Sequence, residues 1–77
     1  MSTEISGFEV TPEDVSLVCR QLGKAVSAEG ADELFRQHIQ PRLIAIQAVA
    51  LQADELEQQT VYAHAEIQRI LKQAGLF

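Results

Sequence analysis

The feature that most constrains the fold is a long helix-forming stretch between Ala31 and Ala74. It contains no glycine, and Pro41 is its one strong helix breaker. Apolar residues recur along it in two sets with a seven-residue period, and such 3-4 spacing is typical of a helix seam that packs on another helix. The sequence therefore predicts an all-α, coiled-coil-like protein. Arg42 and Thr60 are the two exceptions to the apolar pattern among thirteen positions. The two sets are Ile39, Ile46, Ala53, Thr60, Ile67, Ala74 and Phe35, Arg42, Val49, Leu56, Ala63, Ile70, Phe77.

A shorter helix is predicted before this stretch. Thr11 is a good N-cap, Pro12 suits the first helical position, and Asp14 three residues after Thr11 makes a capping-box variant. Val10 and Val15 occupy the positions of a hydrophobic staple. The apolar stripe of this helix is Val15, Val18, Cys19, Leu22 and Val26.

Glycine and serine mark the ends of the predicted elements. Gly23 is the expected stop of the first helix, Ser27 is the N-cap of the next, and Gly75 is the C-cap of the last. We expect residues 1–10 to be a polar N-terminal tail and residues 11–77 to be a single helical domain.

The long stretch is compatible with two architectures. In the first, the helix is kinked at Pro41, and Arg42 to Ala74 form one helix about 50 Å long that pairs with a second chain. In the second, the chain turns within residues 54–60, Thr60 caps a new helix, and a two-helix hairpin forms. The segment 54–60 contains no glycine, proline or asparagine, which favours the long helix. In both cases we expect oligomerisation to complete the helical bundle.

One part of the stretch is apolar on nearly every side. Between Leu43 and Leu51 the only polar residue is Gln47. A helix of this kind is buried on several sides. The first helix can cover one side, so a second chain or a fold-back of the C-terminal segment must cover the rest.

Composition excludes several classes of protein. The chain has 77 residues, a net charge of −5 and six scattered basic residues, which disfavours direct binding of nucleic acid. Its longest apolar run is far shorter than the roughly 20 residues of a membrane span. A lone cysteine and the lack of an export signal predict a cytoplasmic protein.

Few residues could carry chemistry. Cys19 lies on an apolar stripe and is predicted to be a core residue. His38 and His64 have no metal-binding neighbour at helical spacing, so both are predicted to lie at the surface or an interface. The acidic cluster Asp54, Glu55 and Glu57 is predicted to be a solvated face that could steer a basic partner. We expect no enzyme activity, no cofactor and no metal.

Two resemblances cover parts of the chain. The order of helices is similar in outline to a histone fold without its basic loop residues, which implies dimerisation without DNA binding. The first forty or so residues resemble the C subunit of tRNA-dependent amidotransferases, a non-catalytic helper that wraps a larger subunit, although that family continues with an extended tail. We assign the chain to neither family. The second resemblance rests on residues 11–15, 18–19, 26–29 and 34–35.

The function predicted from these observations is that of a non-catalytic interaction module. It acts as a homodimer or as an accessory or regulatory subunit that docks an apolar helix face on a larger protein. The alternative is a small acidic regulator or inhibitor of a nucleic-acid-handling protein, such as an antitoxin, a transcription regulator or a phage-encoded inhibitor. The predicted interface residues are Phe35, Ile39, Leu43, Ile46, Val49, Leu56, Ile67, Ile70, Leu76 and Phe77.

Overall fold

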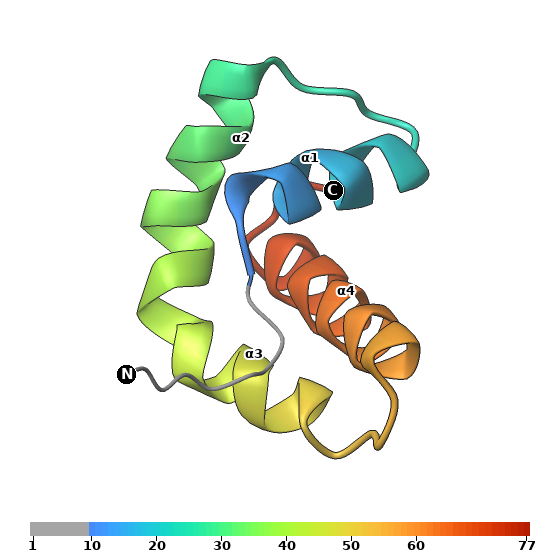
Figure 1. Ribbon diagram of the computed structural model, residues 1–77. Helices are drawn as coiled ribbons and strands as arrows, with labels where there is room; N and C mark the ends of the chain where they lie inside the picture. The colour runs from blue at the N-terminus through green and yellow to red at the C-terminus, as the bar shows by residue number, and fades with distance from the viewer. Residues whose placement is uncertain (1–9) are drawn as a thin grey trace, which may run out of the picture.

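The computed structural model describes residues 10–77, which are mostly helical (Figure 1). These residues form no strand, so the all-α prediction is confirmed. A wide π-helical turn and a 3-10 turn join α2 to α3. In chain order the elements are α1 (Pro12–Gln21), α2 (Ala28–Leu34), the π-helical turn (Phe35–Ile39), the 3-10 turn (Gln40–Arg42), α3 (Leu43–Ala50) and α4 (Leu56–Gln73).

Helix α1 begins where its capping signals predict. The backbone N–H of Thr11 donates to Oδ2 of Asp14 at 2.8 Å, and the Thr11 hydroxyl lies 3.2 Å from the same oxygen. Val10 and Val15 of the predicted staple are both buried. Val10, placed at the end of the expected tail, therefore belongs to the core, while residues 1–9 lie outside the described part of the chain.

Two glycines end helices in the same way. The Gly23 N–H donates to the Arg20 carbonyl and the Lys24 N–H to the Cys19 carbonyl, both at 2.9 Å, and Gly23 has a φ of +86°. This is a Schellman motif, which needs a left-handed residue. Gly75, with a φ of +81°, closes α4 through the equivalent bonds. Both predicted stops are confirmed.

Substitution by alanine should have opposite effects at Gly23, which ends α1, and at Gly30, which lies inside α2. Gly23→Ala should lower the free energy of unfolding by about 1 kcal/mol, because an L-residue is strained at positive φ. Gly30 lies inside α2, where an added Cβ would meet its nearest neighbour, Ser27 Oγ, at 3.4 Å. Gly30→Ala should therefore raise stability by roughly 0.5 kcal/mol. Urea denaturation measures both free energies of unfolding. Changes of the same sign in the two variants would contradict the roles given to these glycines.

Pro41 does not end the helix. The chain passes it through the π-helical and 3-10 turns without leaving a helical conformation, and the axis changes direction as α3 begins (Figure 1). Proline lacks an N–H and its ring clashes with the carbonyl one turn earlier. A wider turn before the proline and a tighter one at it accommodate both defects. The predicted kink therefore takes the form of two irregular turns.

The chain leaves the helical conformation between α3 and α4, so the continuous helix from 42 to 74 is not formed. The longest dimension of the described residues is 35 Å, shorter than that helix would be. The link includes Ala53, which is buried and whose carbonyl accepts a hydrogen bond from the Gln59 amide at 3.1 Å. Thr60 does not cap a helix: it lies inside α4, and its hydroxyl donates to the Leu56 carbonyl.

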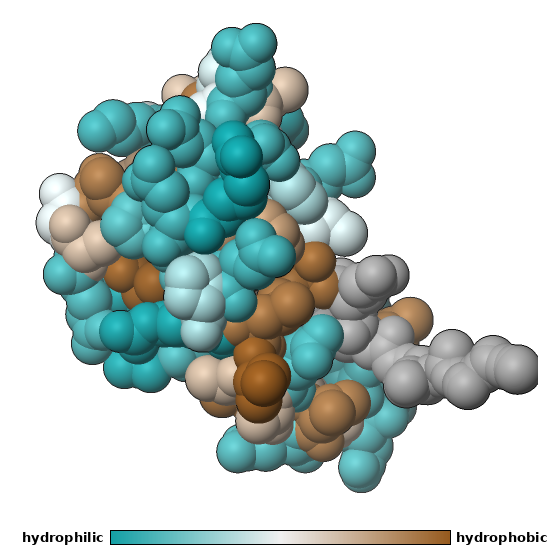
Figure 2. Space-filling view, turned by 90° about the vertical axis from the view of Figure 1, so that its left-hand side faces the viewer, coloured by the Kyte–Doolittle hydropathy of each residue, from teal (hydrophilic) through white to brown (hydrophobic). Residues whose placement is uncertain are grey.

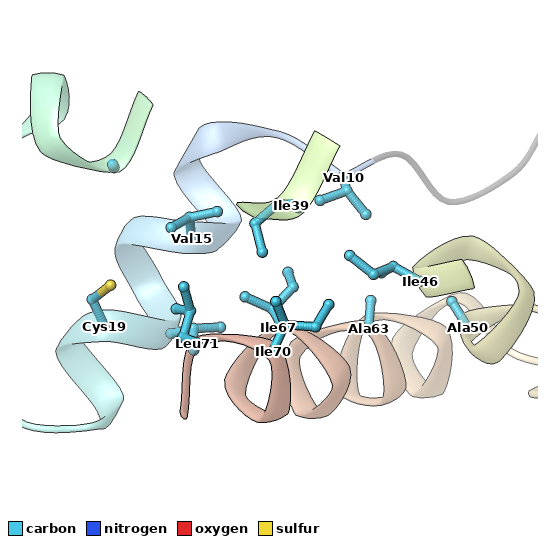
Figure 3. Packing of buried hydrophobic residues seen from close by; sticks show 12 residues of the cluster. Val10, Val15, Cys19, Ile39, Ile46, Ala50, Ala63, Ile67, Ile70 and Leu71 are labelled. Atoms are coloured by element: carbon cyan, nitrogen blue, oxygen red, sulfur yellow. The ribbon is translucent and has the colours of Figure 1, made fainter. Parts of the chain in front are cut away.

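The core is made by residues from every helix and from the π-helical turn. α4 packs against both α1 and α3, and the apolar side chains that meet between them are drawn in Figure 3. Packing of this kind supplies most helical stability in proteins, so burial outweighs the local preference for one long helix. The buried cluster is Val10, Val15, Val18, Cys19, Ala31, Ile39, Ile46, Ala50, Ala63, Ile67, Ile70 and Leu71.

Candidate functional site

Most of the predicted interface residues lie in contact with the chain's own core. Ile39, Ile46 and Ile67 are fully buried and Ile70 is 5% exposed. A partner could reach these four side chains only if the helices separated. Four others are half-buried and pack against the same cluster, namely Phe35, Leu43, Leu76 and Phe77.

Val49 and Leu56 complete the predicted set. Val49 is half-buried, and Leu56 at the start of α4 is 63% exposed. Leu56 belongs to the same seven-residue set as the buried Ala63 and Ile70, but it precedes the part of α4 that the core covers. Of the predicted interface residues, it is the most accessible to a partner.

Three exposed apolar residues, two on α3 and one at its C-cap, lie outside the predicted interface set. Ile44 is 84% exposed and Leu51 is 59% exposed, and Ala48 between them is also exposed. Their spacing of four and three residues places them on one face of a helix. We call Ile44, Ala48 and Leu51 the outer stripe of α3. Apolar side chains gather in the lower half of the face in Figure 2, where α3 lies.

The outer stripe exists because α3 is apolar on nearly all sides. Its inner face carries the buried Ile46 and Ala50, which pack toward α4. The packing of α4 against α3 thus covers one side of the apolar segment from Leu43 to Leu51 and leaves the opposite side open to solvent. Ile44 and Leu51 are thus two large apolar side chains exposed on the same side of α3, two helical turns apart.

Negative charge adjoins one end of the outer stripe. Asp54, Glu55 and Glu57 follow Leu51 within six residues and are all exposed. Within residues 10–77 none of the three forms an ion pair. The negative C-terminal end of the α3 dipole and the positive N-terminal end of the α4 dipole both lie near this segment, and their effects oppose each other.

Three of the six basic residues have partners among the described residues. Arg36 pairs with Asp32 at 3.5 Å, as its spacing of four residues predicts. Arg69 pairs with Glu66, and the Lys24 ammonium lies 5.5 Å above the centre of the Phe77 ring. The exposed Arg42 lies two residues before Ile44, so the outer stripe has acidic residues after one end and a basic residue before the other.

A histidine and a carboxylate join α1 to α4. His64 Nε2 lies 2.9 Å from Asp14 Oδ1, and the two side chains are only 13% and 19% exposed. His64 is thus mostly covered by its own chain. Asp14 uses its other oxygen in the cap of α1, so one carboxylate fixes both the helix start and the contact with α4. This arrangement orients α1 on α4.

Cys19 lies in the core, as predicted, and is fully buried. Burial raises the pKa of its thiol, and the positive charge of Lys24 offsets part of that effect. The thiol is therefore neutral at neutral pH in the folded protein, and a neutral thiol is a poor nucleophile.

We accordingly expect Cys19 to react with a disulfide reagent only as fast as the protein unfolds. Because the pKa of this thiol is higher in the folded than in the unfolded state, the free energy of unfolding is greatest below the ordinary thiol pKa and falls as pH rises above that value. Thiol titration with and without denaturant, and urea midpoints from pH 7 to above pH 9, test both points. Immediate labelling of native protein would contradict the burial of this side chain.

The remaining candidates offer little for ligand binding. Within the described residues no group of three or more His, Cys, Asp or Glu side chains could hold a metal ion. His38 and Arg42 line an open hollow of about 280 Å³ near the end of α4, slightly below the usual size of ligand pockets. Across residues 10–77 no helix has the combination of length and apolarity that crossing a bilayer requires.

Comparison of the chain with protein-family models, with curated proteins and with solved structures finds no match. Neither the amidotransferase-subunit resemblance nor the histone-fold resemblance therefore gains support from a relative.

Proposed function

We propose that this protein is a small, non-catalytic helical module that binds another protein through the outer stripe of α3. The partner is a second copy of the chain or a larger protein to which the module is an accessory or regulatory subunit. The observation that carries the proposal is the 84% exposure of Ile44 on a helix whose opposite side is already packed. Covering such a side chain removes apolar area from water and favours association.

The proposal is tested by affinity purification with matched baits. Ile44→Ser removes the most exposed side chain of the outer stripe, whereas Val61→Ser changes a residue that is 60% exposed on α4. Both substitutions should leave the fold unchanged, because neither side chain is buried. We expect the wild type and Val61→Ser to recover the same amount of the partner. Ile44→Ser should recover at least about tenfold less of it. Equal recovery by all three baits would contradict the proposal.

A second candidate function is favoured by the acidic cluster. Asp54, Glu55 and Glu57 are exposed and unpaired within residues 10–77, which suits a regulator that covers a basic surface on a nucleic-acid-handling protein. The same purification separates the two candidates. A nuclease, polymerase or repressor among the partners that depend on Ile44 would favour this second function.

A further inference from the structure

We infer that two copies of this chain exchange α4, so that the α4 of each chain packs on the α1 and α3 of the other. In the exchanged dimer, residues 51–55 join α3 and α4 into one continuous helix. The inference does not rest on the proposed function, because the exchange uses the inner face of α3, opposite the outer stripe. It is carried by the conformation of the link between α3 and α4 and by the exposure of Leu56 beside it.

The link between α3 and α4 turns the chain without any residue that requires a turn. Residues 51–55 include no glycine or proline, and the positive φ angles of residues 10–77 belong to Gly23 and Gly75. Leu51 keeps helical angles (φ −73°, ψ −5°), while Glu55 is extended (φ −104°, ψ 144°). Helical angles are open to every residue of the link, so the link can straighten into a helix without steric strain.

The start of α4 gains hydrogen bonds when the link straightens. In the hairpin, Glu55 makes no side-chain capping bond to the first N–H groups of α4. In a continuous helix these N–H groups donate to the carbonyls of residues 52–54. The turned link is held by the burial of Ala53 and by the bond from the Gln59 amide to the Ala53 carbonyl. A helical bond to the same carbonyl replaces the second of these contacts.

The core contacts of α4 are the same in both states. In the hairpin α4 packs against α1 and α3 and buries Ala63, Ile67, Ile70 and Leu71. An exchanged α4 makes these contacts with the other chain, so they cancel from the free-energy difference between monomer and dimer. The helix formers of the link favour the dimer, and the entropy lost on association favours the monomer. The dimer is therefore the form expected at high protein concentration.

Leu56 adds a contact that the monomer lacks. It shares a seven-residue set with the buried Ala63, yet it is 63% exposed. Arg42 before α3 and Gln73 at the end of α4 line the same hollow, so α3 and α4 run in opposite directions. The long helices of two exchanged chains then also run in opposite directions and cross midway between Arg42 and Gln73, within one turn of Leu56. The two Leu56 side chains lie near this crossing, where covering them favours association.

The distance between positions 42 and 73 of one chain distinguishes the two states. In the hairpin both residues line one hollow, whereas a continuous helix places their Cα atoms about 46 Å apart. Arg42→Cys and Gln73→Cys replace exposed side chains and carry spin labels, which are attached to the native protein while the Cys19 thiol is buried.

The labelled chain is mixed with an excess of unlabelled chain, unfolded and refolded at high concentration, and the dimer is isolated by size-exclusion chromatography. Electron spin resonance should give a distance of about 46 Å in the dimer. In the monomer the distance should lie well below 35 Å, the longest dimension of the described residues. A short distance in both fractions, or no dimer after refolding at millimolar concentration, would overturn the inference.

Two substitutions of Leu56 separate the straightened link from the leucine contact. Proline suits the first position of α4 in the hairpin because the preceding Glu55 is already extended, but it breaks a helix that continues through this position. Leu56→Pro should therefore lower the dimer association constant at least about a hundredfold and leave a helical monomer. Leu56→Ala removes the apolar side chain alone and should lower it about tenfold. Equal effects in sedimentation equilibrium would show that the link stays turned in the dimer and would overturn the inference.

Ile44→Ser separates this inference from the proposed function. It removes the most exposed side chain of the outer stripe and leaves the link intact, so the association constant of the exchanged dimer should not change. A dimer that dissociates with Ile44→Ser but persists with Leu56→Pro would overturn the inference and support the outer stripe as the self-association surface. An exchanged dimer whose purification recovers the same partners with and without Ile44→Ser would support the inference and contradict the proposed function alone.

Discussion

Replacing Ile67 with alanine should lower the free energy of unfolding by about 3–4 kcal/mol. Ile67 is fully buried between α1 and α3, and its truncation leaves a cavity among side chains that cannot close around it. A chain of this length has a total stability of roughly 4–12 kcal/mol. The variant should therefore be marginally folded or unfolded at 37 °C.

Ile44→Ala provides the matched control, because it deletes the same atoms from the same residue type. Ile44 is 84% exposed, so its truncation should change stability by less than about 0.5 kcal/mol. Urea denaturation followed by circular dichroism measures both variants. Comparable losses of unfolding free energy at the two positions would mean that the buried cluster around Ile67 is not what holds the helices together.

The second large effect is expected at Asp14. Asp14→Ala removes the capping bond to Thr11 and leaves His64 without its partner across the α1–α4 contact. A lost helix cap costs about 1 kcal/mol, and a lost partner of a mostly buried polar group costs about another 1 kcal/mol. We therefore expect a loss of about 2 kcal/mol. Glu13→Ala, one residue earlier and exposed, should cost a few tenths of a kcal/mol.

A double-mutant cycle isolates the contact between the two side chains. Thermal or urea unfolding of Asp14→Ala, His64→Ala and the double variant should give a coupling energy of about 1 kcal/mol. A coupling energy near zero, with the two single effects adding, would show that Asp14 stabilises only the start of α1. The cycle thus separates the cap from the α1–α4 contact.

The local features of the fold could be predicted from the sequence because they depend on neighbouring residues. The Thr11 cap, the glycine stops and the Asp32–Arg36 pair each involve residues within a few positions of one another. The Ser27 cap is of the same kind: its hydroxyl oxygen accepts a hydrogen bond from the Gly30 N–H at 3.0 Å.

The break between α3 and α4 could not be predicted in this way. Nothing in residues 51–55 opposes a helix strongly, so the break follows from the burial of Ile46 and Ala50 against α4. That gain depends on residues far along the chain. The contact between Asp14 and His64 joins residues 50 positions apart and has no sequence signal.

The candidate site was predicted in part. The apolar composition of the segment from Leu43 to Leu51 indicates that more than one of its sides must be covered, either by a second chain or by a fold-back of the C-terminal segment. Which side stays open depends on how α4 approaches α3, and that choice exposes Ile44 and buries Ile46. The seven-residue pattern alone could not separate residues that pack within the chain from residues that a partner can reach.

The most direct test of the docking surface is photo-crosslinking in living cells. A photoreactive amino acid replaces Ile44 in one variant and Val61 in the other, and adducts are identified by mass spectrometry after irradiation. We expect a defined protein adduct from position 44 and none, or far less, from position 61. Adducts of equal yield at both positions, or none at position 44, would contradict the claim that the outer stripe of α3 is where a partner binds.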